Sequence, residues 1–276
     1  MYQFSVDESL CTHCGLCAVD CPACIIDQEG DGLPSISPDK EELCYKCQHC
    51  LAVCPTGAIS ILGKNPADSR PLSSASFPSF EQMDHFIRSR RSIRHYQDKN
   101  VDPSLISNLL KTLAYAPTGV NMQELTFNVI DDKDVMSRFR DTLFATLAEA
   151  TAKDSFPEQF ARLKEIAELP RDVASRLIFR GAPHALIVSG PPEALCVDAD
   201  VVLSVAYFDL LAQSTGLGTL WWGYLKFILT AVPELKSVLG IPEDHVFYGA
   251  LFGLPAIKYA RTTQKDNVAE IKRVTL

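Results

Sequence analysis

The chain has 276 residues, 47% of them hydrophobic, which is enough for one small domain and one larger domain with a substantial core. Its formal net charge of −8 and pI of about 5.3 argue against a nucleic-acid partner, which would favour a basic face. The chain opens without a basic region and apolar run, and Asp209 interrupts its richest apolar stretch. We therefore expect a cytoplasmic protein that does not enter a membrane.

Nine of the ten cysteines lie between Cys11 and Cys54, and eight of them form two copies of one spacing. The runs are CTHCGLCAVDCP from Cys11 and CYKCQHCLAVCP from Cys44, 33 residues apart. In a reducing cytoplasm, such closely spaced cysteines are more typical of metal binding than of disulfides. Residues 1–64 also carry nine acidic and three basic side chains, so most of the net charge lies in this part.

The spacing C-x-x-C-x-x-C-x-x-x-C-P resembles that of the bacterial two-cluster ferredoxins, over residues 1–62. The resemblance implies two [4Fe-4S] clusters that exchange their fourth ligands. One cluster would be held by Cys11, Cys14, Cys17 and Cys54, and the other by Cys44, Cys47, Cys50 and Cys21. An alternative is a pair of structural zinc sites, because C-x-x-C hooks also bind tetrahedral zinc.

The remaining two cysteines stand outside this pattern. Cys24 aligns with Gly57 of the second run, and we interpret it as a buried thiol beside a cluster. Cys196 lies in an apolar run and is interpreted as a core residue. Alternating apolar residues at positions 2–6 and 59–61 predict two short strands that close the cysteine-rich module.

A stretch rich in proline and serine, residues 65–78, follows the cysteine-rich part. This composition, with little apolar periodicity, is typical of a linker. We therefore expect two domains, one of residues 1–64 and one of residues 79–276.

The larger domain is predicted to mix helices with buried strands. Ser79 is expected to open its first helix and Asp102 its second, which ends before Pro117. Apolar runs predict strands over residues 125–131, 184–190 and 245–253. Further helices are predicted over 133–152, 158–180, 198–215 and 234–239, and the helix from 198 is apolar nearly all round. The fold class is therefore α+β, a central sheet with surrounding helices.

The segment RRSIRHY, just after the first predicted helix, carries Arg90, Ser92 and Arg94. Its Arg-x-Ser-x-Arg spacing is similar to a motif of the nitroreductase family, flavin-dependent oxidoreductases that bind FMN between the subunits of a homodimer. The resemblance implies that Arg90 engages the phosphate or ribityl chain of FMN and that Arg94 engages the pyrimidine edge. A guanidinium suits both tasks, because it binds phosphate in a bidentate manner and carries a fixed charge.

A second motif, APTGVNMQ, is similar to the family's Ala-Pro-Ser-x-x-Asn-x-Gln. The resemblance implies that Pro117, Thr118 and Asn121 lie against a flavin bound mainly by the other subunit. The same residues would also make an ordinary turn that ends a helix. The family often continues with Pro-Trp, whereas this chain has Glu124 and Leu125, so the pocket wall differs here.

Two further motifs follow in family order. GLGTLWWG contains Trp222 and Gly223, and the resemblance implies that the backbone of Gly223 approaches the hydride-accepting nitrogen of the flavin. FGLPAIKYART ends with the pair Arg261 and Thr262, and Arg261 is the expected second phosphate ligand.

These resemblances together imply an FMN-dependent oxidoreductase that exchanges electrons between its two clusters and an organic oxidant, such as a nitro compound, a quinone or an activated alkene. The flavin carries the chemistry, so no catalytic side chain is nominated. Two alternatives stay open: direct reduction by NAD(P)H with the clusters in another role, and a non-catalytic electron relay or redox sensor. The expected partners are a second copy of the chain, an external ferredoxin-like donor and a small-molecule oxidant.

Overall fold

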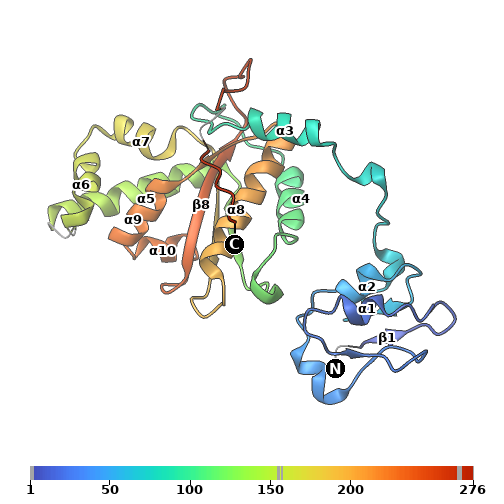
Figure 1. The fold of residues 1–276 in the computed structure, drawn as a ribbon. Helices are drawn as coiled ribbons and strands as arrows, with labels where there is room; N and C mark the ends of the chain where they lie inside the picture. The colour runs from blue at the N-terminus through green and yellow to red at the C-terminus, as the bar shows by residue number, and fades with distance from the viewer. Residues whose placement is uncertain (1–2, 154–155, 157, 266–268, 276) are drawn as a thin grey trace. The chain divides into compact units, whose positions relative to one another are not determined.

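The computed structural model describes residues 3–153, 156, 158–265 and 269–275. The chain forms two compact units (Figure 1). The first comprises the residues up to Pro78 together with the short segment 120–122, and the second comprises residues 79–119 and those from Gln123 onward. Each unit has a hydrophobic core of its own.

The first unit contains two short helices and two small antiparallel sheets. Its helices are α1 (Leu16–Val19) and α2 (His49–Val53), and its strands are β1 (Ser5–Val6), β2 (Ile26–Asp27), β3 (Ser35–Ile36) and β4 (Ile59–Ser60). Strand β1 pairs with β4, which agrees with the strand pair expected from the sequence, and β2 pairs with β3. The β2–β3 pair is too short to produce a recognisable alternation of apolar residues.

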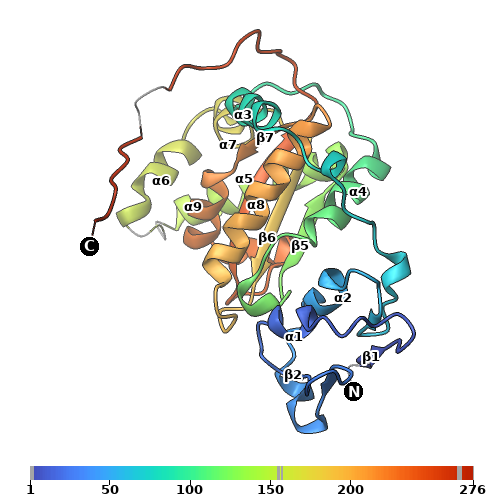
Figure 2. The ribbon, with the colours of Figure 1, turned by 45° about the vertical axis from the view of Figure 1, so that its right-hand side comes forward.

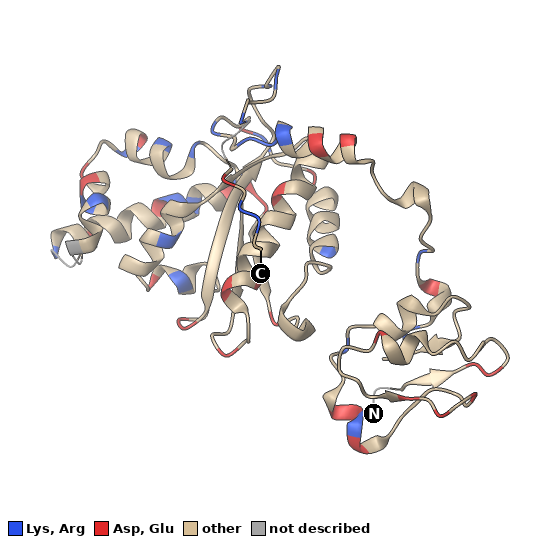
Figure 3. Cartoon of the chain, viewed as in Figure 1, with Lys and Arg blue, Asp and Glu red and all other residues tan. Residues whose placement is uncertain are grey.

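The core of this unit is small. It consists of Cys17, Ile25, Ile26, Cys50, Leu51, Ile59 and Ile61. All ten cysteines of the chain are free thiols. Acidic residues outnumber basic ones in this unit, whose cartoon carries both red and blue segments in Figure 3. A core of this size supplies little stability by itself, so the fold is of the kind that depends on added cross-links or metal.

A four-stranded antiparallel sheet forms the centre of the second unit (Figure 2). Its strands are β5 (Thr126–Ile130), β6 (His184–Gly190), β7 (Gly218–Trp221) and β8 (Val246–Gly253), in the order β5-β6-β8-β7. Strand β6 is buried along its whole length, because it lies between two neighbouring strands and under helices on both faces.

Helices cover both faces of this sheet. The helices of the second unit are α3 (Phe80–Ser89), α4 (Pro103–Leu113), α5 (Lys133–Ala152), α6 (Ala161–Ala167), α7 (Arg171–Phe179), α8 (Val197–Ser214), α9 (Gly223–Ala231) and α10 (Leu235–Val238). Successive residues of a strand point to opposite faces. Leu186 and Val188 of β6 therefore pack with α4 and α8, whereas Ala185 and Ile187 pack with α5, α7 and α9.

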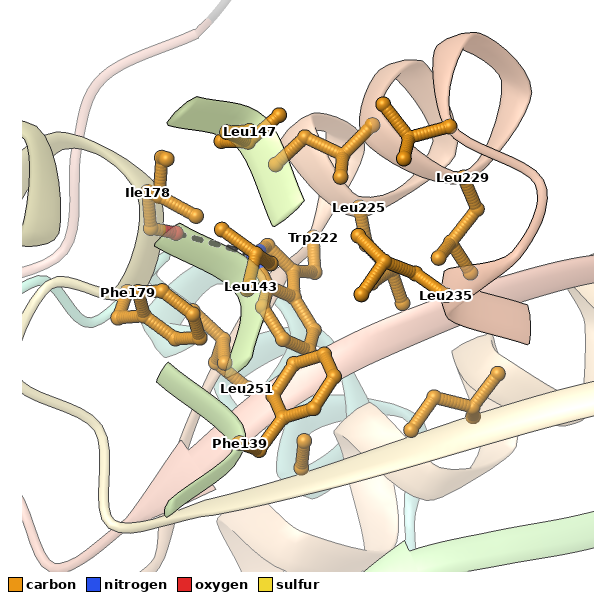
Figure 4. Packing of buried hydrophobic residues seen from close by; sticks show 14 of the residues in the cluster. Phe139, Leu143, Leu147, Ile178, Phe179, Trp222, Leu225, Leu229, Leu235 and Leu251 are labelled. Carbon is orange, nitrogen blue, oxygen red and sulfur yellow. Dashed lines mark hydrogen bonds between the residues drawn. The ribbon is translucent and has the colours of Figure 1, made fainter. Parts of the chain in front are cut away.

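Large side chains around Trp222 fill the core on the α5 side (Figure 4). The Trp222 side chain is 1% exposed, and its ring centroid lies 5.3 Å from that of Phe179 and 6.3 Å from that of Phe139. Its indole N–H donates to the carbonyl of Ile178 at 2.9 Å (Figure 4). The indole is therefore packed and fully satisfied inside the protein.

In the second unit, most helices and strands follow the sequence prediction, and three do not. Ser79 and Gln82 form the expected capping box of α3, and Asp102 caps α4. The helix expected over 158–180 is divided into α6 and α7, because proline at position 170 lacks the N–H that a continuous helix needs. Strand β7 and helix α9 were not predicted, because the glycine-rich motif that contains their junction has the composition of a loop.

Candidate functional site

The two cysteine runs line two separate cavities in the first unit. Cys11, Cys14, Cys17 and Cys54 line one cavity. Cys44, Cys47, Cys50 and Cys21 line the other. Each cavity thus collects three cysteines from one run and the last cysteine from the other run. This is the exchanged grouping expected from the ferredoxin-like spacing.

The loops around the two cavities have matching backbone conformations. His13 and Gly15 of the first run have positive φ angles, and Lys46 and Gln48 occupy the corresponding positions of the second run with the same handedness. The third cysteine of each run, Cys17 or Cys50, then lies in the first turn of α1 or α2 and is at most 7% exposed. Only one of these four residues with a positive φ angle is glycine, the residue that adopts such angles most readily. The conformation of the two loops therefore depends on the surrounding structure more than on the intrinsic preferences of these residues.

The pKa values of these thiols are shifted in different directions. Burial raises the pKa of Cys17, and it raises the pKa of Cys50 to about 12. Burial would also raise the pKa of Cys54, but hydrogen bonds from the backbone N–H of Ala58 and from Thr56 bring it below its ordinary value. Four sulfurs around each apolar cavity fit the thiolate ligand set of an iron–sulfur cluster, and binding would displace protons from the buried thiols.

Two of our interpretations of single cysteines were wrong. Cys24 is exposed and lines neither cavity, because the turn after Cys21 carries it outward with a φ of 52°. Cys196 is exposed as well, at the N-terminal cap of α8, where its side chain packs against Gly119. Each residue lies at an element boundary, where apolar neighbours in the sequence do not ensure burial.

In the second unit, Arg90 is held by a buried carboxylate. Arg90 caps the C-terminus of α3, and its Nη1 lies 3.4 Å from Oδ2 of Asp209 on α8. The Asp209 side chain is 6% exposed and that of Arg90 is 33% exposed, so the guanidinium keeps a solvent-accessible face. Asp209 also accepts bonds from the hydroxyl of Thr219 and, at 3.1 Å, from Nε1 of Trp221. These donors compensate the buried charge.

The segment after Arg90 is attached to strand β7. Ser92 and Thr219 form an isolated parallel β-bridge. The N–H of Ile93 donates a hydrogen bond of 2.8 Å to the carbonyl of Thr219. This segment also contains buried polar atoms that have no partner in the described part of the chain, namely Nε and Nη2 of Arg91 and the hydroxyl of Tyr96. Burial and the charge of Asp209 raise the pKa of Tyr96. Unsatisfied buried donors at this position fit a site that a polar ligand completes.

The second predicted segment, residues 117–119, is fixed to the same helix. The backbone N–H of Gly119 lies 3.1 Å from both carboxylate oxygens of Asp200, which is 5% exposed on α8. The hydroxyl of Thr118 accepts a bond from the N–H of Gln123, and Pro117 remains exposed. Helix α8 therefore anchors both predicted flavin-binding segments, each through one buried aspartate.

The other predicted flavin ligands are placed in different ways. Gly223 begins α9 and is partly exposed, where a backbone N–H at a helix start can face a ligand. Trp222, which precedes Gly223, has its indole buried in the core and bonded to the carbonyl of Ile178, so its place among the FMN ligands stays a prediction that concerns its backbone. Arg94 and Arg261 are exposed, and Asn121 is partly buried in a turn where it has a positive φ angle.

The residues that organise this site were not predicted from the sequence. Asp200, Asp209, Thr219 and Trp221 hold the predicted ligands in position. A signal for two of them was present, because Asp200 and Asp209 are acidic residues within a helix that is otherwise apolar nearly all round. Buried acids in such a helix indicate specific partners.

Asp209→Asn should lower the free energy of unfolding of the second unit by about 2 kcal/mol, because it removes the charge that faces Arg90 but keeps an acceptor for Trp221. The matched control is Asp84→Asn, whose exposed pair with Arg88 should contribute less than about 1 kcal/mol. Urea titrations followed by tryptophan fluorescence report on this unit, since both tryptophans belong to it. Equal effects of the two substitutions would contradict the assigned role of Asp209.

Comparison with known protein families finds a match in each of the two parts of the chain. Residues 87–254 match the family model described as the nitroreductase family, and residues 10–59 match the 4Fe-4S dicluster domain. The first match covers more than half of the chain, so the chain belongs to the nitroreductase family. The predictions of a nitroreductase-family oxidoreductase, of an N-terminal dicluster domain and of an α+β fold are therefore confirmed.

Curated relatives match the two parts of the chain separately. An iodotyrosine dehalogenase 1 homologue of Caenorhabditis elegans is 26% identical over 57% of this chain, and the chain spans 50% of that relative's length. The iodotyrosine deiodinase of Danio rerio is 26% identical over 67% of this chain and 66% of its own length. An uncharacterized ferredoxin of Methanocaldococcus jannaschii is 37% identical over 21% of this chain and 90% of its own length.

Solved structures confirm the fold of the larger unit. A nitroreductase of Bacteroides fragilis with bound FMN aligns with a TM-score of 0.53 and 20% identity, over 68% of this chain and 97% of that chain. An FMN-dependent nitroreductase of Clostridium difficile aligns with a TM-score of 0.52 and 20% identity, over 71% of this chain and 100% of that chain.

Within the described residues, no helix has both the length and the apolar character needed to cross a bilayer.

Proposed function

We propose that this protein is an FMN-dependent oxidoreductase that exchanges electrons between two [4Fe-4S] clusters and a small organic substrate. The observation that carries the proposal is the presence of both family matches in one chain, each on a unit whose side chains suit the corresponding cofactor. The ferredoxin-like unit offers two cavities with four thiols each. The larger unit offers cationic and unsatisfied polar groups next to its first family motif.

In this proposal, the cavity groups are the cluster ligands. Cys11, Cys14, Cys17 and Cys54 hold one cluster, and Cys44, Cys47, Cys50 and Cys21 hold the other. Proline follows the last ligand of each run, at Pro22 and Pro55, where it fixes the backbone. Because the ligands cross between the runs, each cluster would tie the two halves of the unit together and supply the stability that its small core lacks.

The FMN ligands in this proposal are Arg90, Ser92, Arg94, Pro117, Thr118, Asn121, Gly223 and Arg261. Bound FMN supplies the ability to exchange electrons singly with iron–sulfur clusters and as a hydride equivalent with organic molecules. Arg90 binds and orients the phosphate or ribityl chain, and Asp209 keeps its guanidinium in one position. The turn at Pro117 and Thr118, fixed through Asp200, limits the position of the flavin ring.

The second unit leaves an apolar surface uncovered on its central helix. Val202, Leu203 and Tyr207 of α8 keep 40–41% of their surface exposed, although neighbouring positions of the same helix are fully buried. Large exposed apolar residues on a core helix are typical of an interface. We infer that α8 of one subunit meets a second copy of the chain, which sedimentation of the FMN-loaded protein would detect. A monomer that retains one FMN per chain would contradict this inference.

The substrate class is tested by anaerobic reduction and reoxidation of the purified protein. Reduced ferredoxin and NAD(P)H are offered separately as donors, and bleaching of the flavin identifies the donor. A nitroaromatic, a quinone, an activated alkene and a halogenated phenol are then offered as oxidants, the last because curated relatives are named iodotyrosine dehalogenase 1 homologue and iodotyrosine deiodinase. Saturable turnover of one class supports an enzyme. Flavin and clusters that reduce and reoxidise without any turnover would instead favour the electron relay.

Arg90→Gln and Arg261→Ala should each weaken FMN binding about tenfold or more, because each removes a charge-assisted donor to the phosphate-bearing ligand. The dissociation constant is measured by the quenching of flavin fluorescence on titration into cofactor-free protein. Arg88→Gln is the matched control, since Arg88 lies on the same helix and pairs with Asp84 on its surface. If both variants bind FMN as tightly as the control, neither arginine belongs to the site.

A further inference from the structure

The two cysteine-lined cavities are not equivalent, although their sequences repeat after 33 residues. Cys54 is followed by Pro-Thr-Gly-Ala, whereas Cys21 is followed by Pro-Ala-Cys-Ile. Thr56 therefore corresponds to Ala23 in the repeat. Both residues line the cavity that their neighbouring cysteine enters. A hydroxyl is thus present beside one site and absent from the corresponding position of the other.

The hydroxyl of Thr56 is placed next to a predicted cluster ligand. Its Oγ1 lies 3.7 Å from Sγ of Cys54, and the backbone N–H of Ala58 donates to the same sulfur at 3.2 Å. When Cys54 is a thiolate, the hydroxyl is the only possible donor of the Thr56–Cys54 pair. In the other cavity, the N–H of Lys46 donates to Sγ of Cys44 at 3.4 Å. Alanine at position 23 has no side-chain donor.

Reduction of an iron–sulfur cluster adds one negative charge, part of which resides on the ligand sulfurs. Hydrogen bonds to these sulfurs stabilise the reduced form and raise the reduction potential, and solvent exposure acts in the same direction. Cys14 in the first cavity is exposed, whereas its counterpart Cys47 is only partly so. Both differences give the first cluster the higher reduction potential. The positive charge of Lys46, beside the second cavity, would instead raise the potential of the second cluster. This charge is exposed, so solvent and salt screen it.

We propose that Thr56 tunes the cluster held by Cys11, Cys14, Cys17 and Cys54 to the higher potential, so that this cluster accepts the first electron. This proposal depends on the cluster ligation given under Proposed function. The step is the addition of one electron from a low-potential reductant to the oxidised cluster, without formation or cleavage of any covalent bond. The hydroxyl contributes a hydrogen bond to Cys54 and keeps its proton. The electron then rests on a defined cluster until the flavin or a partner removes it.

Anaerobically purified full-length protein is titrated with dithionite, and cluster reduction is followed by electron paramagnetic resonance. Thr56→Ala should lower one midpoint potential and shift the partition of the electron between the clusters by about tenfold, which corresponds to about 59 mV for one electron. Ala23→Thr grafts the hydroxyl onto the repeated position and should raise the other midpoint. Thr56→Ser keeps the hydroxyl and should behave as the unchanged protein.

Thr12→Ala is the matched control, because Thr12 lines the same cavity and, within the described residues, no hydrogen bond joins its hydroxyl to a sulfur. Iron is measured in every variant. Full iron content with no shift in Thr56→Ala, or a shift equal to that of Thr12→Ala, would overturn the tuning role and leave the cluster proposal intact. Absence of iron from the unchanged protein would overturn both. Thr56→Ala and Ala23→Thr must move different midpoints, and movement of the same midpoint would refute the assignment.

Discussion

Cys54→Ala should remove one whole cluster and lower the iron content of the anaerobically purified protein from about eight to about four atoms per chain. The lost cluster should be the one held by Cys11, Cys14 and Cys17, because these three cysteines share a cavity with Cys54. The cluster of the run that contains Cys54 should survive, since its fourth thiol is Cys21. Iron analysis gives the stoichiometry, and electron paramagnetic resonance of the reduced protein identifies the remaining signal.

Two further substitutions make this test specific. Cys21→Ala should remove the other cluster, so that its spectrum complements that of Cys54→Ala. Cys24→Ala is the control, because Cys24 is an exposed cysteine of the same unit that lines neither cavity. Its iron content should stay at about eight. Loss of the same signal in the Cys54 and Cys21 variants would rule out exchanged ligands, and zinc in place of iron would favour structural zinc sites.

Patterns of spacing predicted the architecture well, because each rests on local chemistry. The exchanged cysteine grouping was implied by the resemblance of the two runs to the spacing of two-cluster ferredoxins, and the capping box at Ser79 and Gln82 needs only two side chains three residues apart. The burial of β6 on both faces likewise follows from a short, continuous apolar run. For the capping box and for β6, the information that determines the structure lies within a few residues.

Features that depend on distant residues could not be predicted in the same way. Asp209 has its role because Arg90, Thr219 and Trp221 converge on it from α3 and β7, and no local pattern encodes this convergence. Trp222 lies within the family motif GLGTLWWG, yet its indole belongs to the core because α9 begins immediately after it. Adjacent tryptophans therefore have opposite roles, one bonded to Asp209 and the other packed against Phe179.

Residues 79–276 alone should lose fast flavin reduction by reduced ferredoxin but keep any reduction by NAD(P)H that the full chain shows. The truncated chain should still fold and bind FMN, because both cores of the larger unit consist of residues after position 79. In the full chain, covalent attachment raises the effective concentration of the first unit at the second. Stopped-flow absorbance measures flavin bleaching by each donor in the two proteins, with thermal unfolding and FMN content as checks that the shorter chain is intact.

The salt dependence of the flavin reduction rate distinguishes docking of an external protein donor from electron transfer within the chain. The cysteine-rich part carries nine acidic and three basic side chains, so a donor that docks there should present a basic surface, and its rate should fall as ionic strength rises. Reduction by NAD(P)H should not depend on the charge of that unit, and its salt dependence should be the same in both proteins. If the shorter chain accepts electrons from reduced ferredoxin as fast as the full chain, ferredoxin reduces the flavin directly. The clusters then do not conduct electrons to it, and their role must be sought in another step.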